Sequence, residues 1–149
     1  EMSASLVGSE MCIRDRVEIE ELLKENGFSA PENKSYNPTR ATRPVFRNLS
    51  PKEKDELIKE NPDYGHVICR CEEVTRGEIL DAIRTNPAAL DVDGIKRRTR
   101  SGMGRCQGGF CMPQVLEILA EELGKNPDDI TKKGVNSKIL YGKIKGGNE

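Results

Sequence analysis

Residues 98–111 read RTRSGMGRCQGGFC, and this stretch contains two of the chain's five cysteines, Cys106 and Cys111. A second tight pair, Cys69 and Cys71, lies earlier in the chain, and 34 residues separate the two pairs. Paired thiols that the intervening fold brings together are common ligands of iron–sulfur clusters and of structural zinc. We therefore expect these four cysteines to hold one metal centre.

The spacing within the pairs favours one cofactor over the other. Four thiolates can hold either a 2Fe-2S cluster or a tetrahedral zinc ion, but structural zinc sites more often have gaps of about two to four residues in both pairs. The single residue between Cys69 and Cys71 is less usual for zinc. Clustered cysteines in a reducing compartment are also more often ligands than disulfides. The sequence favours the cluster and leaves zinc and disulfide bonds as alternatives.

Small residues surround the second pair. Glycines stand at positions 102, 104, 108 and 109, where they allow unusual backbone dihedral angles and a close approach of the chain to an inorganic core. Pro113 marks a helix start directly after Cys111, which brings partly positive helix amides to a thiolate. Five basic residues lie nearby in the sequence: Lys96, Arg97, Arg98, Arg100 and Arg105. We expect part of this basic stretch to offset the negative charge of a cluster.

Other candidate features near the cysteines carry less weight. The chain's single histidine, His66, lies three residues before Cys69. One histidine cannot make the two-histidine Rieske site, so a structural or supporting role is expected. Cys12 stands apart from both pairs, and we expect no role for it in the site. The glycines at 102 and 104 are no dinucleotide fingerprint, because no strand precedes them and no third glycine opens a helix.

The composition limits the class of protein. A chain of 149 residues accommodates one small domain with extensions. It is 35% hydrophobic and 33% charged and has no Trp, which predicts a small apolar core. We therefore expect a metal site to contribute to the stability of the fold. The formal net charge of -1 gives no general attraction to nucleic acid. No apolar run reaches the roughly 18 residues of a transmembrane helix and no secretory signal is recognisable, so we expect a cytoplasmic protein. A partner subunit is the route by which it could be associated with a membrane.

The sequence pattern divides the chain into three regions. Residues 1–16 lack periodicity and resemble a translated adapter sequence, so we expect a non-native segment. Residues 17–49 begin with apolar residues at helical spacing and continue with a Pro-rich stretch, which predicts the last helix of a larger preceding domain followed by an extended linker. Residues 50–145 are expected to form the cluster-binding domain.

Helix start and stop signals predict that this domain is small and mainly α. A capping hydroxyl followed three residues later by glutamate occurs at Ser50 and again at Thr75, and predicts one helix to about Lys59 and another of about ten residues. Further helices are expected over residues 92–99 and 113–123. The tail, residues 137–144, is expected to be a short strand or an extended arm.

The segment from His66 to Leu123 resembles the bacterioferritin-associated-ferredoxin-like (BFD-like) 2Fe-2S binding domain. The resemblance rests on CRCE at 69–72, VTRGEI at 74–79, KRRTRSGMGRCQG at 96–108 and Cys111. Taken with the upstream helix, the linker and LSPKEK at 49–54, the chain resembles the C-terminal end of FAD-dependent oxidoreductases similar to anaerobic glycerol-3-phosphate dehydrogenase.

This resemblance implies the cofactors and partners. It implies a 2Fe-2S cluster on Cys69, Cys71, Cys106 and Cys111, FAD in a missing upstream flavoprotein domain of the same parent chain, and an electron-acceptor protein or subunit. Because the chain has no nucleotide fingerprint and no recognisable substrate pocket, we expect an electron-transfer module that is not catalytic alone. A structural zinc or docking module without a redox role is the alternative.

Overall fold

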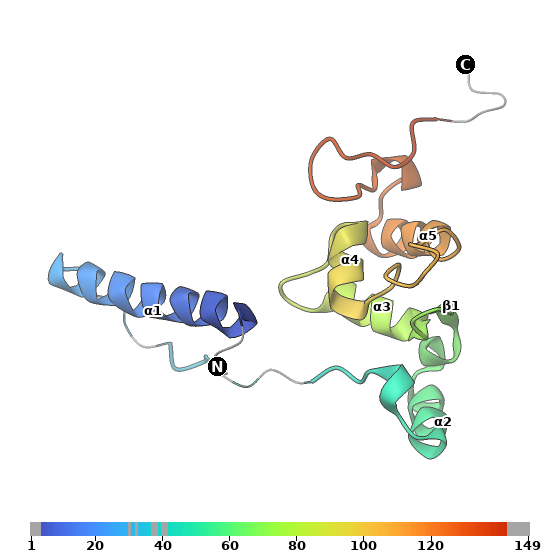
Figure 1. The fold of residues 1–149 in the computed structure, drawn as a ribbon, viewed down its shortest axis with the longest axis horizontal. Helices are drawn as coiled ribbons and strands as arrows, with labels where there is room; N and C mark the ends of the chain where they lie inside the picture. The colour runs from blue at the N-terminus through green and yellow to red at the C-terminus, as the bar shows by residue number, and fades with distance from the viewer. Residues whose placement is uncertain (1–3, 30, 32, 37–38, 40–41, 143–149) are drawn as a thin grey trace. The chain divides into compact units, whose positions relative to one another are not determined.

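The computed structural model describes residues 4–29, 31, 33–36, 39 and 42–142 (Figure 1). The chain divides into two compact units, Glu1–Arg40 and Ala41–Glu149. Both cysteine pairs lie in the second unit. Within the described residues, no helix combines the length and the apolar character that crossing a bilayer requires.

The first unit contains one long helix, α1 (Ala4–Glu25). The sequence predicted a helix only from Val17, but the helix begins at Ala4, and residues 4–16 contain no proline that would interrupt it. The predicted stop at Gly27 is confirmed, since this residue has φ 81°. The apolar side chains of Val17 and Leu22 are each 51% exposed. Cys12 lies in this helix, and its side chain is outside the described part of the structure.

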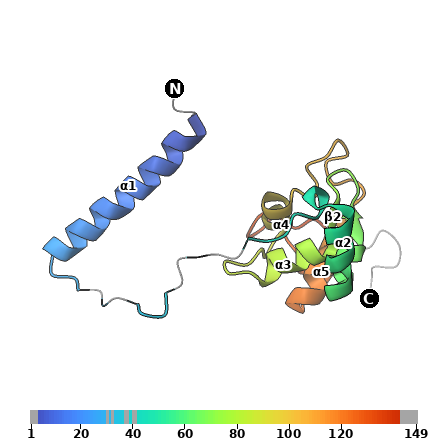
Figure 2. The same ribbon diagram turned by 90° about the horizontal axis from the view of Figure 1, so that it is seen from below.

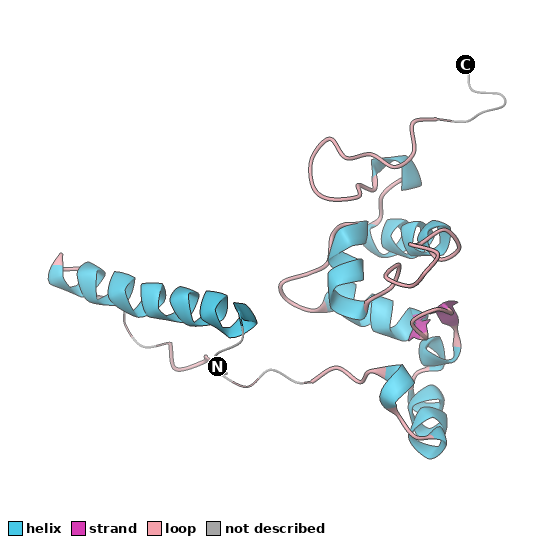
Figure 3. Cartoon of the chain, viewed as in Figure 1, coloured by secondary structure: helices cyan, strands magenta, loops and turns pink. Residues whose placement is uncertain are grey.

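The second unit is mainly helical, as predicted (Figure 3). Its elements are η1 (Phe46–Asn48), α2 (Pro51–Glu60), η2 (Pro62–Gly65), β1 (Val67–Cys69), β2 (Val74–Thr75), α3 (Arg76–Arg84), α4 (Val92–Thr99), α5 (Met112–Leu123) and η3 (Pro127–Asp129). The strands β1 and β2 pair antiparallel, with an irregularity between Val67 and Cys69. This small sheet was not predicted from the sequence.

Local capping residues fix where the helices begin. At α2, the Ser50 hydroxyl accepts from Glu53 N while the Glu53 carboxylate accepts from Ser50 N. The same reciprocal arrangement joins Thr75 and Glu78 at α3. Each capping box satisfies two backbone groups that would otherwise lack a partner at the helix start. Both predicted boxes are therefore confirmed.

The core lies where α3, α4 and α5 pack against one another, and Figure 2 shows α3 and α5 side by side. Each helix contributes a fully buried aliphatic side chain: Ile79, Ile95 and Leu119. Cys69 and Cys111 belong to the same cluster of buried residues. The helical core thus fixes one cysteine from each pair.

Residues 42–49 pack on this unit although the sequence placed them in the linker. Phe46 is 8% exposed, and its backbone N–H donates to Glu78 Oε1 at 3.2 Å. Lys54 Nζ lies 4.9 Å from the centre of the Phe46 ring. In the predicted tail, Lys138 forms an isolated antiparallel β-bridge with Thr131. Residues 143–149 lie outside the described residues.

Candidate metal centre

Two turns and a helix start deliver the four cysteines. Cys69 ends β1, and Cys71 lies in the turn that leads back to β2. Cys106 lies in the turns that follow α4, and Cys111 is the N-cap residue of α5. The β1–β2 turn and the loop between α4 and α5 therefore face each other through their cysteines.

All four cysteines line one cavity of about 440 Å³. The remaining lining residues are Val67, Ile68, Arg70, Phe110 and Gln114. All four cysteines are free thiols. The structure therefore brings together every cysteine that the sequence predicted as a ligand, while the assignment of these residues as ligands stays a prediction.

The thiols are arranged as two pairs, each taking one cysteine from each motif. Cys71 Sγ and Cys106 Sγ lie 3.6 Å apart. The thiol of Cys69 interacts with that of Cys111. Among the described residues, no group of three or more His, Cys, Asp or Glu side chains is placed to hold a single metal ion. A pairwise arrangement fits a 2Fe-2S cluster, in which each iron takes two protein ligands.

The two pairs differ in their exposure to solvent. Cys69 is 1% exposed and Cys111 is 3% exposed. Cys71 is exposed and Cys106 is half-buried. The cavity therefore extends from the apolar core, where water is excluded, to the protein surface.

Hydrogen bonds distinguish the thiols electrostatically. The backbone N–H of Gly108 is the main cause that lowers the pKa of the Cys106 thiol, and the contact with Cys71 is the second. The same contact raises the pKa of the Cys71 thiol. Burial raises the pKa of Cys111, while the hydroxyl of buried Ser101 donates to its sulfur at 3.7 Å and acts in the opposite direction. Donors aimed at sulfur stabilise thiolates, which are the form that binds iron.

Backbone conformation at glycine positions makes the close approach possible. A Cβ at Gly104 would overlap the Cβ of Cys71 and lie 3.2 Å from its sulfur. Gln107 and Gly108 have φ of 48° and 86°, and N–H groups of Gly108, Gly109 and Phe110 act on Cys106. Consecutive amides that turn toward one point form an anion-binding nest. The donor set and the cradle around it therefore fit a negatively charged iron–sulfur core.

The predicted basic stretch does not line the cysteine cavity. Within the described part of the chain, none of its five residues lines the cysteine cavity, whose basic lining residue is Arg70. Arg98 and Arg100 line another pocket, and Arg97 pairs with Asp91 at 3.9 Å. The His66 side chain is exposed. Lys96 lines a further pocket together with Cys111. The expectation that the basic stretch offsets the charge of the site stays a prediction.

Three residues near the thiols were missed by sequence reasoning. Ser101 reaches Cys111 through its hydroxyl, while Arg70 and Phe110 line the cavity. Phe110 is 85% exposed, which is unusual for a large aromatic residue beside a buried cysteine. The position of Arg70 and Phe110 directly next to cysteines was the available signal.

A family model of the BFD-like 2Fe-2S binding domain matches residues 67–121, which include all four cysteines. Residues 67–121 are a BFD-like 2Fe-2S binding domain. The matched segment begins at β1 and ends in α5, so it contains both cysteine-bearing turns, α3, α4 and most of α5.

Curated relatives extend the similarity beyond the BFD-like domain. A glycerol 3-phosphate dehydrogenase of Caloramator mitchellensis is 48% identical over 125 residues, which are 84% of this chain and 26% of that protein. One of the opine oxidase subunits of Rhizobium meliloti is 44% identical over 74 residues, 50% of this chain and 13% of that protein. One of the anaerobic glycerol-3-phosphate dehydrogenase subunits of Haloferax volcanii is 41% identical over 68 residues, 46% of this chain and 11% of that protein. No solved structure matches the chain significantly.

Proposed function

We propose that this chain is an electron-transfer module from the C-terminal part of an FAD-dependent oxidoreductase of the glycerol-3-phosphate dehydrogenase type. The observation that carries the proposal is the convergence of four free thiols on one cavity within the BFD-like domain. The chain spans about a quarter of the length of its relative from Caloramator, which leaves room in such a protein for a flavin domain.

The thiolates of Cys69, Cys71, Cys106 and Cys111 act as ligands and not as nucleophiles. When bound, the 2Fe-2S cluster supplies a one-electron redox couple. The amide of Gly108 and the hydroxyl of Ser101 direct partial positive charge toward two of the sulfurs. Hydrogen bonds to ligand sulfurs and burial are the means by which a protein sets the potential of such a centre.

The module transfers electrons between a flavin and an acceptor. In the parent protein, FAD of the flavoprotein domain would take two electrons from a substrate, and a 2Fe-2S cluster held by Cys69, Cys71, Cys106 and Cys111 would carry them one at a time to an acceptor protein or subunit. Electrons leave the module at the exposed side of the cavity, beside Cys71, where an acceptor can dock. Exposed Phe110 and half-exposed Val67 also line the cavity at this side. The parent protein then works in the cytoplasm, or at a membrane through a partner subunit.

Metal analysis tests the proposal against a structural zinc or docking module. Iron, acid-labile sulfide and zinc are measured per chain on anaerobically purified protein, with an EPR spectrum after dithionite reduction. About two iron and two sulfide per chain, with a rhombic signal on reduction, support the electron-transfer module. About one zinc per chain, with no sulfide and no signal, would replace it with a structural module.

A further inference from the structure

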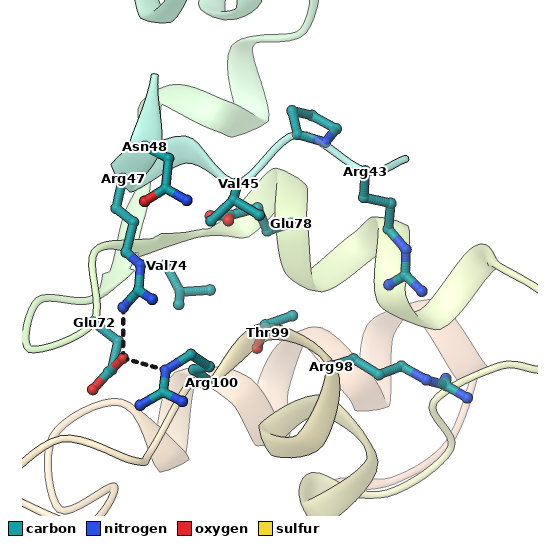
Figure 4. Close-up of a pocket in the computed structure, with 11 residues that line it drawn as sticks. Arg43, Val45, Arg47, Asn48, Glu72, Val74, Glu78, Arg98, Thr99 and Arg100 are labelled. Atoms are coloured by element: carbon teal, nitrogen blue, oxygen red, sulfur yellow. Dashed lines mark hydrogen bonds and ion pairs between the residues drawn. The ribbon is translucent and has the colours of Figure 1, made fainter. Parts of the chain in front are cut away.

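A second cavity, of about 230 Å³, lies between the segment before α2 and the end of α4 (Figure 4). Its charged lining consists of Arg43, Arg47, Arg98, Arg100, Glu72 and Glu78. Four guanidinium groups thus share the cavity with two carboxylates. The proposed electron transfer gives this cavity no role.

The two carboxylates are already engaged within the protein. Glu78 accepts from the backbone N–H groups of Thr75 and Phe46, at 2.8 Å and 3.2 Å. One oxygen of Glu72 accepts from Arg47 at 3.0 Å and from Arg100 at 2.8 Å. Glu72 is therefore the counter-ion of Arg47 and Arg100. Glu78 is occupied by backbone hydrogen bonds, including the one that caps the start of α3.

Arg98 is the unbalanced charge in this cavity. Its side chain is half-buried, and its Nη1 donates to the backbone carbonyl of Ala82 at 3.2 Å. Among the residues that the structure describes, no carboxylate forms an ion pair with Arg98. A partly desolvated guanidinium without a counter-charge is costly unless an anion compensates it.

Arg43 adds a second guanidinium at the same end of the cavity. It is half-buried, and Figure 4 shows Arg43 and Arg98 at the end away from Glu72. The volume exceeds the roughly 30 Å³ that one water occupies in the liquid several times over, so a tetrahedral oxyanion fits with accompanying waters. Guanidinium groups bind phosphate-type oxyanions through two parallel hydrogen bonds.

We propose that this cavity is an oxyanion site for the phosphate group, with Arg98 as its principal contact and Arg43 as the second. The ligand is inorganic phosphate or the phosphate of a small phosphomonoester. Because the site requires no cluster, it stands independently of the proposed electron transfer.

Calorimetric titration of the purified full chain with inorganic phosphate at low ionic strength tests the site. Binding to R98Q should be at least about tenfold weaker than to the wild type, because a charge-assisted contact is lost. R97Q is the matched control, since Arg97 is exposed, belongs to the same helix and does not line the cavity. Equal weakening in R97Q and R98Q, or no saturable binding to the wild type, would overturn the proposal.

Two further arms complete the test. R43Q and R98K serve if R98Q fails to fold by circular dichroism: R43Q should also bind phosphate more weakly, while R98K should fall between the wild type and R98Q. Unchanged affinity in both variants would overturn the site.

Methyl phosphate binding more tightly than inorganic phosphate identifies a phosphomonoester as the ligand, and the reverse order identifies free phosphate. Saturable binding of a polyglutamate peptide without any binding of phosphate would overturn the proposal in favour of a protein partner.

Discussion

Cys71 Sγ and Cys106 Sγ lie 3.6 Å apart, although 34 residues lie between them in the sequence. The contact joins the β1–β2 turn to the loop before α5, and it lies at the exposed side of the cavity. A 2Fe-2S cluster needs four thiolates, so loss of one should impair binding. Because Cys71 and Cys106 are less buried than Cys69 and Cys111, substituting them should disturb the apolar core least.

We predict that C71S lowers the iron and sulfide content of the purified chain well below that of the wild type. The exposed position of Cys71 means that the substitution removes a ligand without opening a hole in the apolar core. C12S is the matched control, because Cys12 belongs to the other compact unit and should leave both contents unchanged. Full iron and sulfide in C71S would remove Cys71 from the ligand set.

G104A should impair metal loading even though all four cysteines remain. The added Cβ overlaps Cys71, so either the β1–β2 turn or the loop before α5 must shift. We expect a large loss of iron per chain, measured together with the near-ultraviolet and visible absorbance. G65A is the control, since its Cβ would lie 3.4 Å from Ile58 Cγ2, an ordinary contact. Normal loading of G104A would show that the two loops adapt freely.

The sequence predicted those features that depend on neighbouring residues. The capping boxes at Ser50 and Thr75 are local, because donor and acceptor lie within three residues, and both are present. The cross-pairing of Cys71 with Cys106 and the contact of Gly104 with Cys71 are set by tertiary packing, which helical periodicity does not encode. For the same reason, the burial of Phe46 within the second unit could not be predicted from a Pro-rich stretch.

Replacing Tyr64 by Phe should destabilise the second unit. The Tyr64 hydroxyl donates to Asp81 Oδ2 at 2.6 Å, and the residue is 3% exposed. Burial, followed by the hydrogen bond to Asp81, raises the pKa of Tyr64, so the phenol stays protonated as the donor. Y64F leaves the half-buried Asp81 carboxylate without this partner, which costs about 1–3 kcal/mol.

Thermal unfolding measures this loss, and about 1 kcal/mol corresponds to a fall in Tm of about 4–8 °C for a domain of this size. Y141F is the matched control, because Tyr141 is 86% exposed and should change stability by less than about 0.5 kcal/mol. If Y64F and Y141F unfold at the same temperature, the Tyr64–Asp81 bond contributes nothing to stability.

The capping box of α2 should make stability depend on pH through Glu53. Hydrogen bonds from the Ser50 hydroxyl and then from the Ser50 backbone N–H lower the pKa of the Glu53 carboxyl. A carboxyl whose pKa is lower in the folded state stabilises that state above its unfolded pKa of about 4.3, and this contribution is lost as the pH falls through the folded pKa. E53Q cannot ionise, so the wild type should unfold at a higher temperature than E53Q at pH 7, and the difference should shrink below about pH 4. The wild type and E53Q have the same cysteines, so any loss of metal in acid affects both Tm values and cancels in their difference. A difference in Tm that stays constant from neutral to acid pH would show that the ionised Glu53 carboxylate does not stabilise the start of α2.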